Sequence, residues 1–371
     1  MTPLGERIAA LIAAQGPMSI AQFMTLTLLD AKDGYYATRD PFGARGDFIT
    51  APEVSQMFGE LLGLWLAQVW QDQGRPARPR LVELGPGRGT LMNDALRALR
   101  LVPAFRDALD VVLVEASPVL RDLQRETLKD CGVAVRWAEN FDTALADRPL
   151  FLLANEFFDA LPIHQYVKSE SGWHERMVTL DADGALVFVL APVAISNARL
   201  PANRDGAPRG GVYEQCLAGE ALMEEIARAI AAQGGAALIV DYGYDAAGFA
   251  ETLQAVADHK YAELLAEPGA SDLSAHVDFN ALGDAVVRGG ASVCGPVGQG
   301  EFLLALGIVQ RADRLVQKQT IGGDWRHRDH LGDSPDIRRQ LEKLILPEQM
   351  GTLFKALAVV PRTAPMPPGF G

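Results

Sequence analysis

An acidic residue and three alternating glycines separate a short apolar run from an amphipathic stretch in the segment VELGPGRGTLMNDALRAL, residues 82–99. Glu83 precedes the turn Gly85–Pro86–Gly87, and Gly89 leads into Thr90, where the apolar periodicity predicts that a helix begins. A glycine loop before a helix N-terminus is typical of a site that holds a small ligand at the end of a strand. This order of acid, glycine loop and helix therefore predicts a ligand site.

Two ligand classes can be compared for this loop. A dinucleotide fold requires G-x-G-x-x-G/A with a pyrophosphate on the helix N-terminus, whereas this loop has G-x-G-x-G followed by Thr90. Glu83 would repel a pyrophosphate but would attract an ammonium or sulfonium group. Glu115 ends the next apolar run, in VLVEASP, where its carboxylate can accept hydrogen bonds from two ribose hydroxyls. The two acids favour a nucleoside with a cationic tail, such as S-adenosylmethionine, and a plain glycine turn is the alternative.

Two further segments are candidates for the same ligand. Asn140 and Phe141 follow the third apolar run, where an amide could hydrogen-bond an adenine base and a ring could stack on it. Their alternative role is a helix cap and a core aromatic. Gly46 and Thr50 precede a long apolar stretch, so this loop and the helix N-terminus could hold the methionine carboxylate. The alternative there is a connector in which Thr50 caps the helix.

A second group of polar residues, in LLANEFFDALPIHQ, follows the fourth apolar run. Asn155, Glu156 and Asp159 should therefore emerge at the carboxyl edge of a parallel sheet, where such folds place their ligand crevice. Two carboxylates three residues apart could hold a guanidinium, whose forked donors match carboxylate oxygens. Methyl transfer to that group depends on orientation and charge neutralisation more than on strong proton abstraction. Capping by Asp159 and ion pairing by Glu156 are the alternatives.

Short apolar runs and helical patterns alternate along the chain and must position these residues. The runs lie at 80–84, 110–116, 133–139, 150–156 and 236–243, with helical patterns at 90–100, 117–130 and 219–233. Near-continuous apolar strands that alternate with helices predict an α/β fold, with a mostly parallel, doubly wound sheet covered on both faces. The long crossover between the fourth and fifth runs predicts an inserted β-rich lobe, with turns at Ser171–Gly172 and Asp183–Gly184.

The patterns predict three regions. Residues 1–75 form an N-terminal helical extension that packs on the core, including a long, buried helix that starts at Thr50 with capping-box spacing to Glu53. Residues 76–360 form the core, with the lobe at about 163–215. The Pro- and Gly-rich residues 361–371 form a flexible tail.

The composition restricts the class of protein. The 371 residues are 49% hydrophobic and carry a net charge of −13, which argues against a nucleic-acid binder and fits a neutral or basic partner. The 3 cysteines and 6 histidines show no metal-ligand spacing, so no metal is expected. Neither a leader before Thr2 nor an apolar run near the ~20 residues of a membrane span is visible, so we expect a cytoplasmic protein without membrane insertion.

The chain resembles the MidA family, which comprises bacterial and mitochondrial relatives of the seventh assembly factor of respiratory complex I. The resemblance covers roughly residues 5 to 360. It rests on motifs that occur in the family's order: GDFITAPEVSQMFGELLG, VELGPGRGTLM, VEASPVLR, NEFFDALPIHQ, GWHERMV, VDYG, LQAVADHK, DLSAHVDF and GPVGQGEFL.

The resemblance implies a class I, Rossmann-like S-adenosylmethionine-dependent methyltransferase. It implies that Glu83, Gly85, Gly87 and Glu115 bind the cofactor and that Asn155, Glu156 and Asp159 line the acceptor side. The mitochondrial member is understood to dimethylate, symmetrically, an arginine of the complex I subunit that lines the quinone-binding region. We therefore expect a protein arginine methyltransferase that aids complex I assembly, in a bacterial cytoplasm.

Two other functions stay open at this stage. One is a methyltransferase for a small molecule or a nucleic acid, although nucleic-acid enzymes of this kind usually carry N-P-P-Y, and Asn155 is followed by Glu156. The other is an assembly chaperone that binds the cofactor without turnover, because intact cofactor motifs indicate binding and not catalysis.

Overall fold

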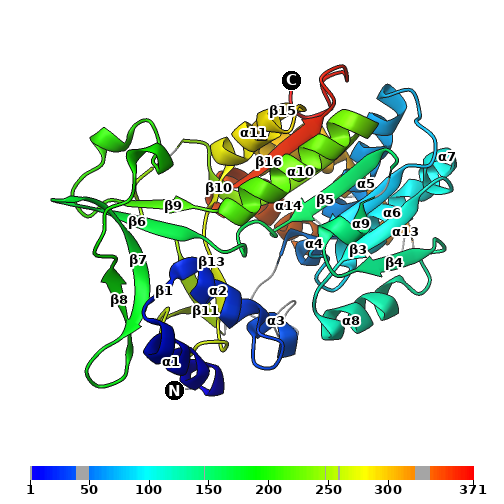
Figure 1. Cartoon of the computed structure of the whole chain (residues 1–371). Coiled ribbons are helices and arrows are strands. Elements are labelled where there is room, and N and C mark those ends of the chain that lie inside the picture. Colours follow the sequence, from blue (N-terminus) through cyan, green and yellow to red (C-terminus); the bar gives the residue numbers. More distant parts are fainter. Residues whose placement is uncertain (1, 39–49, 146, 247, 258–259, 322–334) are drawn as a thin grey trace. The chain divides into compact units, whose positions relative to one another are not determined.

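The structure is a computed structural model that describes residues 2–38, 50–145, 147–246, 248–257, 260–321 and 335–371. The chain divides into two compact units, each assembled from separate segments. The first unit consists of Met1–Phe48, Phe158–Leu222 and Tyr244–Leu282, and the second of Ile49–Phe157, Met223–Gly243 and Gly283–Gly371. Figure 1 traces the elements of both units along the chain.

A mostly parallel sheet forms the centre of the second unit. The strands of its main path are β2 (Arg80–Leu84), β3 (Asp110–Val114), β4 (Val135–Ala138), β5 (Leu150–Asn155), β10 (Gly235–Tyr244), β15 (Ser292–Gly298) and β16 (Phe354–Val360), and the short β14 (Val277–Asp278) also pairs with β10. They lie in the order β15-β16-β10-β5-β2-β3-β4 (Figure 1). Pairing is parallel from β10 to β4, whereas β16 runs antiparallel to both of its neighbours. The predicted α/β fold with a mostly parallel sheet is confirmed.

The order of the strands reverses at β2. From β2 the chain continues on one side into β3 and β4, and it returns on the other side as β5 and β10. The register pairs Leu84 of β2 with Ala154 of β5, so the segments that follow these two strands leave the sheet at the same level. Doubly wound sheets bind ligands at the carboxyl ends of strands beside such a reversal.

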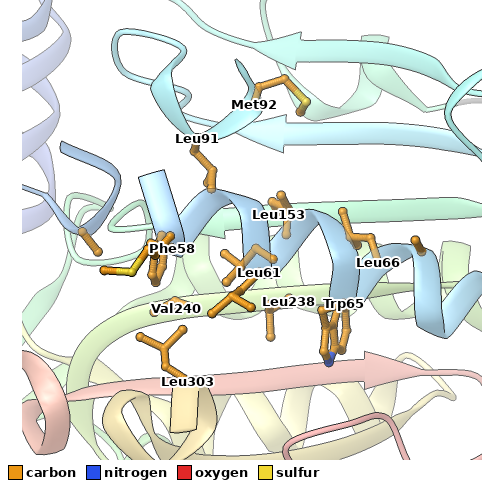
Figure 2. Packing of buried hydrophobic residues seen from close by; sticks show 14 of the residues in the cluster. Phe58, Leu61, Trp65, Leu66, Leu91, Met92, Leu153, Leu238, Val240 and Leu303 are labelled. Atoms are coloured by element: carbon orange, nitrogen blue, oxygen red, sulfur yellow. The ribbon is translucent and has the colours of Figure 1, made fainter. Parts of the chain in front are cut away.

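Helices cover this sheet. They are α4 (Ala51–Val54), α5 (Gln56–Asp72), α6 (Thr90–Ala98), α7 (Pro103–Arg106), α8 (Pro118–Leu128), α9 (Phe141–Ala144), α10 (Leu217–Gln233), α11 (Phe279–Arg288), α12 (Gln299–Ala305), α13 (Ile308–Ile321) and α14 (Pro335–Ile345). Figure 2 shows Phe58, Leu61 and Trp65 of α5 packing among Leu153 of β5 and Leu238 of β10. Each large side chain buried here contributes about 1.5–3 kcal/mol.

Close packing between α5 and α6 depends on glycine. A β-carbon on Gly63 would lie 2.8 Å from the Cα of Ala95, and one on Gly59 would lie 2.7 Å from the Cβ of Asp94. Such distances are shorter than van der Waals contact, so only glycine allows α6 to approach this closely. The approach fixes α6, whose first turn follows the glycine loop.

The structure corrects the start of the long N-terminal helix. The stretch from Thr50 is not one helix, because Ser55 interrupts it in an extended conformation and its Oγ accepts the N–H of Met57 at 3.4 Å. The predicted capping box is also wrong. Thr50 makes no side-chain cap bond, and Glu53 Oε1 instead accepts from the hydroxyl of Thr90 at 2.5 Å.

The first unit contains the N-terminal helices and two antiparallel sheets. The larger sheet has the order β1-β7-β6-β9, with β8 also paired to β7, and the smaller one has the order β12-β11-β13. Its elements are α1 (Pro3–Gln15), β1 (Met18–Ser19), α2 (Ile20–Leu29), α3 (Tyr35–Thr38), β6 (His164–Ser169), β7 (Gly172–Leu180), β8 (Leu186–Leu190), β9 (Val212–Gln215), β11 (Gln254–Ala257), β12 (Lys260–Ala262) and β13 (Asp272–Ser274).

The N-terminal segment and the inserted lobe share this unit. Met18 of β1 pairs with Val178 of β7, and the side chains of Ile8, Phe23 and Val178 lie in one buried cluster. α1, α2 and α3 thus belong to the first unit, whereas the apolar faces of α4 and α5 pack in the second, so the predicted region 1–75 contributes helices to both units. The lobe itself contains the predicted strands.

The C-terminal residues pack within the second unit, although their composition predicted a flexible tail. The indole N–H of Trp65 donates to the carbonyl of Pro368 at 2.9 Å. The ring of Phe370 has its centroid 5.2 Å from that of Phe302 and 6.5 Å from that of Trp65. One aromatic side chain and one backbone acceptor thus anchor the tail.

Among the described residues, no helix has the length and hydropathy of a membrane span.

Candidate functional site

Glu83 is a buried acid at the carboxyl end of β2. Its side chain is 2% exposed, and no described residue is within hydrogen-bonding distance of its Oε2 atom. Burial, with a smaller contribution from the Glu115 carboxylate, raises the pKa of Glu83 from 4.5 to about 8. A buried polar atom without a partner is costly, so the position indicates a group that receives its partner from a ligand.

The loop after β2 needs its glycines. Gly85, Gly87 and Gly89 have φ values of +57°, +52° and +83°, which favour glycine. A β-carbon on Gly85 would lie 2.7 Å from the ring of Phe157. The N–H of Gly89 donates to the carbonyl of Pro86 at 2.7 Å and closes the turn before α6. Three of the five loop residues therefore carry no side chain, at positions 85, 87 and 89.

Glu115 lies after the neighbouring strand β3 and is held by two donors. The N–H of Ser117 donates to its Oε1 at 2.8 Å, and Nε2 of Gln124 donates to its Oε2 at 3.1 Å. Burial raises the pKa of Glu115, while these hydrogen bonds oppose the shift. Each carboxylate oxygen has a second lone pair, so the group retains capacity for two ligand hydroxyls.

Gln124 connects the glycine loop to Glu115, and it is not among the site residues predicted from the sequence. The same Nε2 also donates to the carbonyl of Gly87 at 2.8 Å, and Oε1 accepts from the indole of Trp137 at 2.8 Å. Gln124 is fully buried in α8, between the buried Leu120 and Leu128. A glutamine at four-residue spacing within an apolar helix face was the available signal.

The structure can be compared with the capping and core roles considered above for Asn140, Phe141 and Thr50. Oδ1 of Asn140 accepts the N–H of Thr143 at 3.0 Å and caps α9, and Phe141 is buried. Thr50 precedes α4 without a side-chain cap bond, so the connector role with capping is not seen. Gly46 lies outside the described residues.

Asn155 ends β5 and Glu156 follows it, beside the glycine loop after β2. Nδ2 of Asn155 donates to Glu156 Oε1 at 3.2 Å, and no described residue is a hydrogen-bond partner of Asn155 Oδ1. Glu156 Oε1 also accepts the N–H of Ala51 at 3.1 Å. Glu156 itself has φ +49°, a left-handed conformation that costs a non-glycine residue about 1 kcal/mol. Such strain is typical of functional sites.

Asp241 is a second residue near the site that was not predicted from the sequence. It is fully buried in β10, and its Oδ2 accepts the N–H of Phe157 at 3.1 Å. Its Oδ1 accepts the N–H of Tyr242 at 2.9 Å. Asp241 thus fixes the backbone that follows Glu156 and helps to hold its left-handed conformation. The motif VDYG contained this acid at the end of an apolar run.

Asp159 belongs to the first unit. It is buried, and its backbone carbonyl accepts the N–H of Ala275 at 2.9 Å. Burial, Asp272 and Asp159 together raise the pKa of Tyr36, whose hydroxyl donates to Asp272 at 2.9 Å. The structure therefore places Asp159 near Tyr36 and Asp272.

The second unit thus brings polar groups to the carboxyl ends of three adjacent strands. Asn155 ends β5 and Glu156 follows it, Glu83 lies near the end of β2 before the glycine loop, and Glu115 follows β3. In this arrangement carboxylates can bind hydroxyls and cations, and the glycine loop exposes its backbone to a ligand at three positions.

Comparison with known proteins gives this arrangement a family. The family model described as "Putative S-adenosyl-L-methionine-dependent methyltransferase" matches residues 61–297. A protein named "Protein arginine methyltransferase NDUFAF7, mitochondrial" from Xenopus tropicalis is 36% identical over 389 residues, which cover 97% of this chain and 87% of that protein. The protein of the same name from Homo sapiens is 34% identical over 392 residues, with 97% and 84% covered.

A solved structure supports the same assignment. A protein from Burkholderia thailandensis, crystallised with S-adenosyl-homocysteine, is 30% identical and aligns with a TM-score of 0.82, covering 99% of this chain and 93% of that one. The motifs, the sheet topology and these matches agree, and the chain belongs to the MidA-type family of S-adenosyl-L-methionine-dependent methyltransferases.

Proposed function

We propose that this methyltransferase transfers methyl groups to an arginine side chain of a protein, and that its acceptor is a subunit of respiratory complex I. The observation that carries the methyl-transfer part of the proposal is the buried Glu83 carboxyl group beside the glycine loop, at the reversal of the strand order. Relatives named protein arginine methyltransferase support the choice of acceptor.

The residues present fit S-adenosyl-L-methionine, the cofactor of this family. Its cationic tail suits the unpartnered Oε2 of Glu83, and its ribose hydroxyls suit the lone pairs of Glu115. We assign the backbone of Gly85–Pro86–Gly87 and Gly89 to the tail as well, and Asn140 and Phe141 to the adenine. Thr50 and Gly46 are assigned to the methionine carboxylate. When bound, the cofactor supplies a methyl group on a positively charged sulfur.

Asn155, Glu156 and Asp159 are the residues we assign to the acceptor. The Oδ1 atom of Asn155 can accept from a guanidinium N–H, and the carboxylate of Glu156 can neutralise its charge. Both residues precede a backbone segment that Asp241 fixes, which keeps their side chains in one orientation. Asp159 is proposed as the second carboxylate of this group.

Charge and likeness to known proteins support the choice of a protein acceptor. A net charge of −13 favours a basic protein acceptor and disfavours nucleic acid. The curated relatives are named as mitochondrial proteins. For this chain we propose a bacterial cytoplasm, with the complex I subunit that lines the quinone site as the substrate.

A paired experiment on the purified protein tests the proposal. The protein is titrated with S-adenosylmethionine, S-adenosyl-homocysteine and NAD, and is then incubated with a labelled methyl donor and a lysate from a strain that lacks the gene. We expect binding of the first two ligands and label in one protein band, whose modified residue mass spectrometry identifies as arginine. Label on another residue type, or none in the presence of bound cofactor, contradicts the arginine methyltransferase; preference for NAD contradicts the assignment of Glu83.

A further inference from the structure

The strand β8 is an exposed apolar edge of the larger sheet in the first unit. It has the sequence LVFVL and pairs only with β7 among the described strands (Figure 1). Phe188, Val189 and Leu190 are 38%, 38% and 39% exposed, and the nearby Val193 is 74% exposed. Edge strands usually carry lysine, proline or a bulge that prevents pairing, and this strand has no charged residue or proline.

Along β8, the backbone N–H and C=O groups of successive residues point alternately toward β7 and toward the open edge of the sheet. The N–H of Ala191 donates to Glu175, and the carbonyl of Ala185 accepts from Asp181, so odd-numbered residues face β7. The N–H and C=O groups of Leu186, Phe188 and Leu190 therefore point away from β7. These three residues form a regular row of donors and acceptors along the edge.

The sequence of β8 is the same in both directions. Antiparallel pairing of LVFVL with a second copy, centred on Phe188, places Phe188 opposite Phe188 and Leu186 opposite Leu190. In this register each of the outward-facing residues can exchange both backbone hydrogen bonds with its partner. Val187 then lies opposite Val189 in the closer, non-hydrogen-bonded positions. A twofold axis through Phe188 requires such self-complementarity.

We propose that β8 is a self-association surface, on which a second copy of this chain pairs antiparallel through residues 186–190. The symmetry of LVFVL favours a second copy over an unrelated strand. In one register, every outward-facing backbone group of residues 186–190 finds a hydrogen-bond partner, and each side chain lies opposite one of the same type. Five residues on each side cover less than a standard interface. We therefore expect a dimer whose population rises with concentration.

Sedimentation velocity from about 1 to about 100 µM protein tests this surface. The wild-type mass should rise from that of the 40.0 kDa chain toward twice that value. The variant V187K/V189K places like charges opposite each other and should weaken the dimer by about tenfold or more. The matched variant V187E/V189K removes the same valines but pairs opposite charges, so it should retain the dimer.

Mixing separates loss of pairing from loss of folding. V187K/V189K and V187E/V189E should each be monomeric alone and should form a dimer when mixed, because every cross-strand pair is then of opposite charge. A wild-type chain that stays monomeric at all concentrations overturns the proposal. Equal dimer populations in V187K/V189K and V187E/V189K overturn it as well, because they place the contact elsewhere.

Discussion

At the scale of single residues, the site depends on groups that are incompletely satisfied or strained. No described residue is a hydrogen-bond partner of the Oε2 atom of Glu83. The same is true of the amide oxygen of Asn155. Glu156 adopts a left-handed backbone conformation. Each of these costs stability in the protein alone, which is expected where a ligand completes the contacts.

The raised pKa of Glu83 predicts a pH-dependent cost to stability. Its pKa is about 8 in the folded protein and ordinarily 4.5, so between these values the folded state binds a proton that the unfolded state lacks. Stability without cofactor should therefore fall as pH rises from about 5 to about 8.5. In Glu83→Gln this fall should be smaller, because the contribution of this one group is removed. Thermal unfolding of both proteins across this range checks the difference, and parallel curves would contradict it.

Glu115→Ala should weaken cofactor binding by about 1–3 kcal/mol, because the ribose loses a charged hydrogen-bond acceptor. Titration calorimetry with S-adenosyl-homocysteine measures the change. Glu126→Ala is a suitable control, since Glu126 is an exposed acid on the adjacent helix α8. Unchanged affinity in Glu115→Ala would show that the ribose lies elsewhere.

Asp159→Asn should suppress methyl transfer and leave cofactor affinity unchanged, because the substitution removes one charge from the acceptor side. Label incorporation and calorimetry are measured on the same preparation. Asp205→Asn, which alters an exposed acid of the same unit, provides the control. A fully active Asp159→Asn protein would refute this assignment.

At the scale of elements, α8 supports the site through one buried side chain. Gln124 joins the loop after β2, the acid after β3 and the indole of Trp137 in β4. Three strand ends are thus held by one glutamine. The helix α8 therefore supports the cofactor site by fixing these groups, although it is not itself one of the loops that form the site.

Gln124→Met should lower the free energy of unfolding by about 1–3 kcal/mol, because it retains the volume of the side chain but leaves buried partners unsatisfied. It should also weaken cofactor binding. Denaturant unfolding and calorimetry check both effects. Gln68→Met, on an exposed face of α5, should change neither quantity. A neutral Gln124→Met would mean that the loop keeps its geometry without this side chain.

Elements with a strong local signal could be predicted from sequence. The apolar run at 80–84 coincides with β2, because a strand buried on both faces is apolar at nearly every position. The three-stranded sheet of β11, β12 and β13 could not be predicted, since strands of three or four residues show no measurable periodicity.

In the site, as in the fold, only the residues with a local sequence signature could be predicted. Glu83 and the glycine loop have local signatures, whereas Gln124 and Asp241 act through partners far away in sequence. The left-handed backbone of Glu156 also has no local signal, because glycine or asparagine is the usual residue in that conformation.

At the scale of the whole molecule, the chain passes repeatedly between the two compact units. Neither unit is a continuous segment, so no composition change marks their boundary. This explains why a linear division of the sequence separated α1 and α2 from the inserted strands with which they share a unit. The net charge of −13 is likewise a property of the entire chain.

This charge predicts salt-sensitive recognition of a basic acceptor. The kcat/KM for the protein acceptor should fall severalfold between about 50 and about 300 mM NaCl, because screening weakens long-range attraction. Cofactor affinity should change by less than about twofold, since its charged contacts are buried. Initial rates and titrations at both salt concentrations check this. A salt-independent kcat/KM would argue for a neutral acceptor.

The conformation of Glu156 also has a consequence for protein engineering. Glycine at position 156 would relieve the left-handed strain, so a library selected for heat resistance alone should enrich Glu156→Gly. The same library selected for methylation should retain glutamate, because its carboxylate holds Asn155 and the start of α4. Opposite outcomes of the two selections at this position would separate what the fold prefers from what the reaction requires.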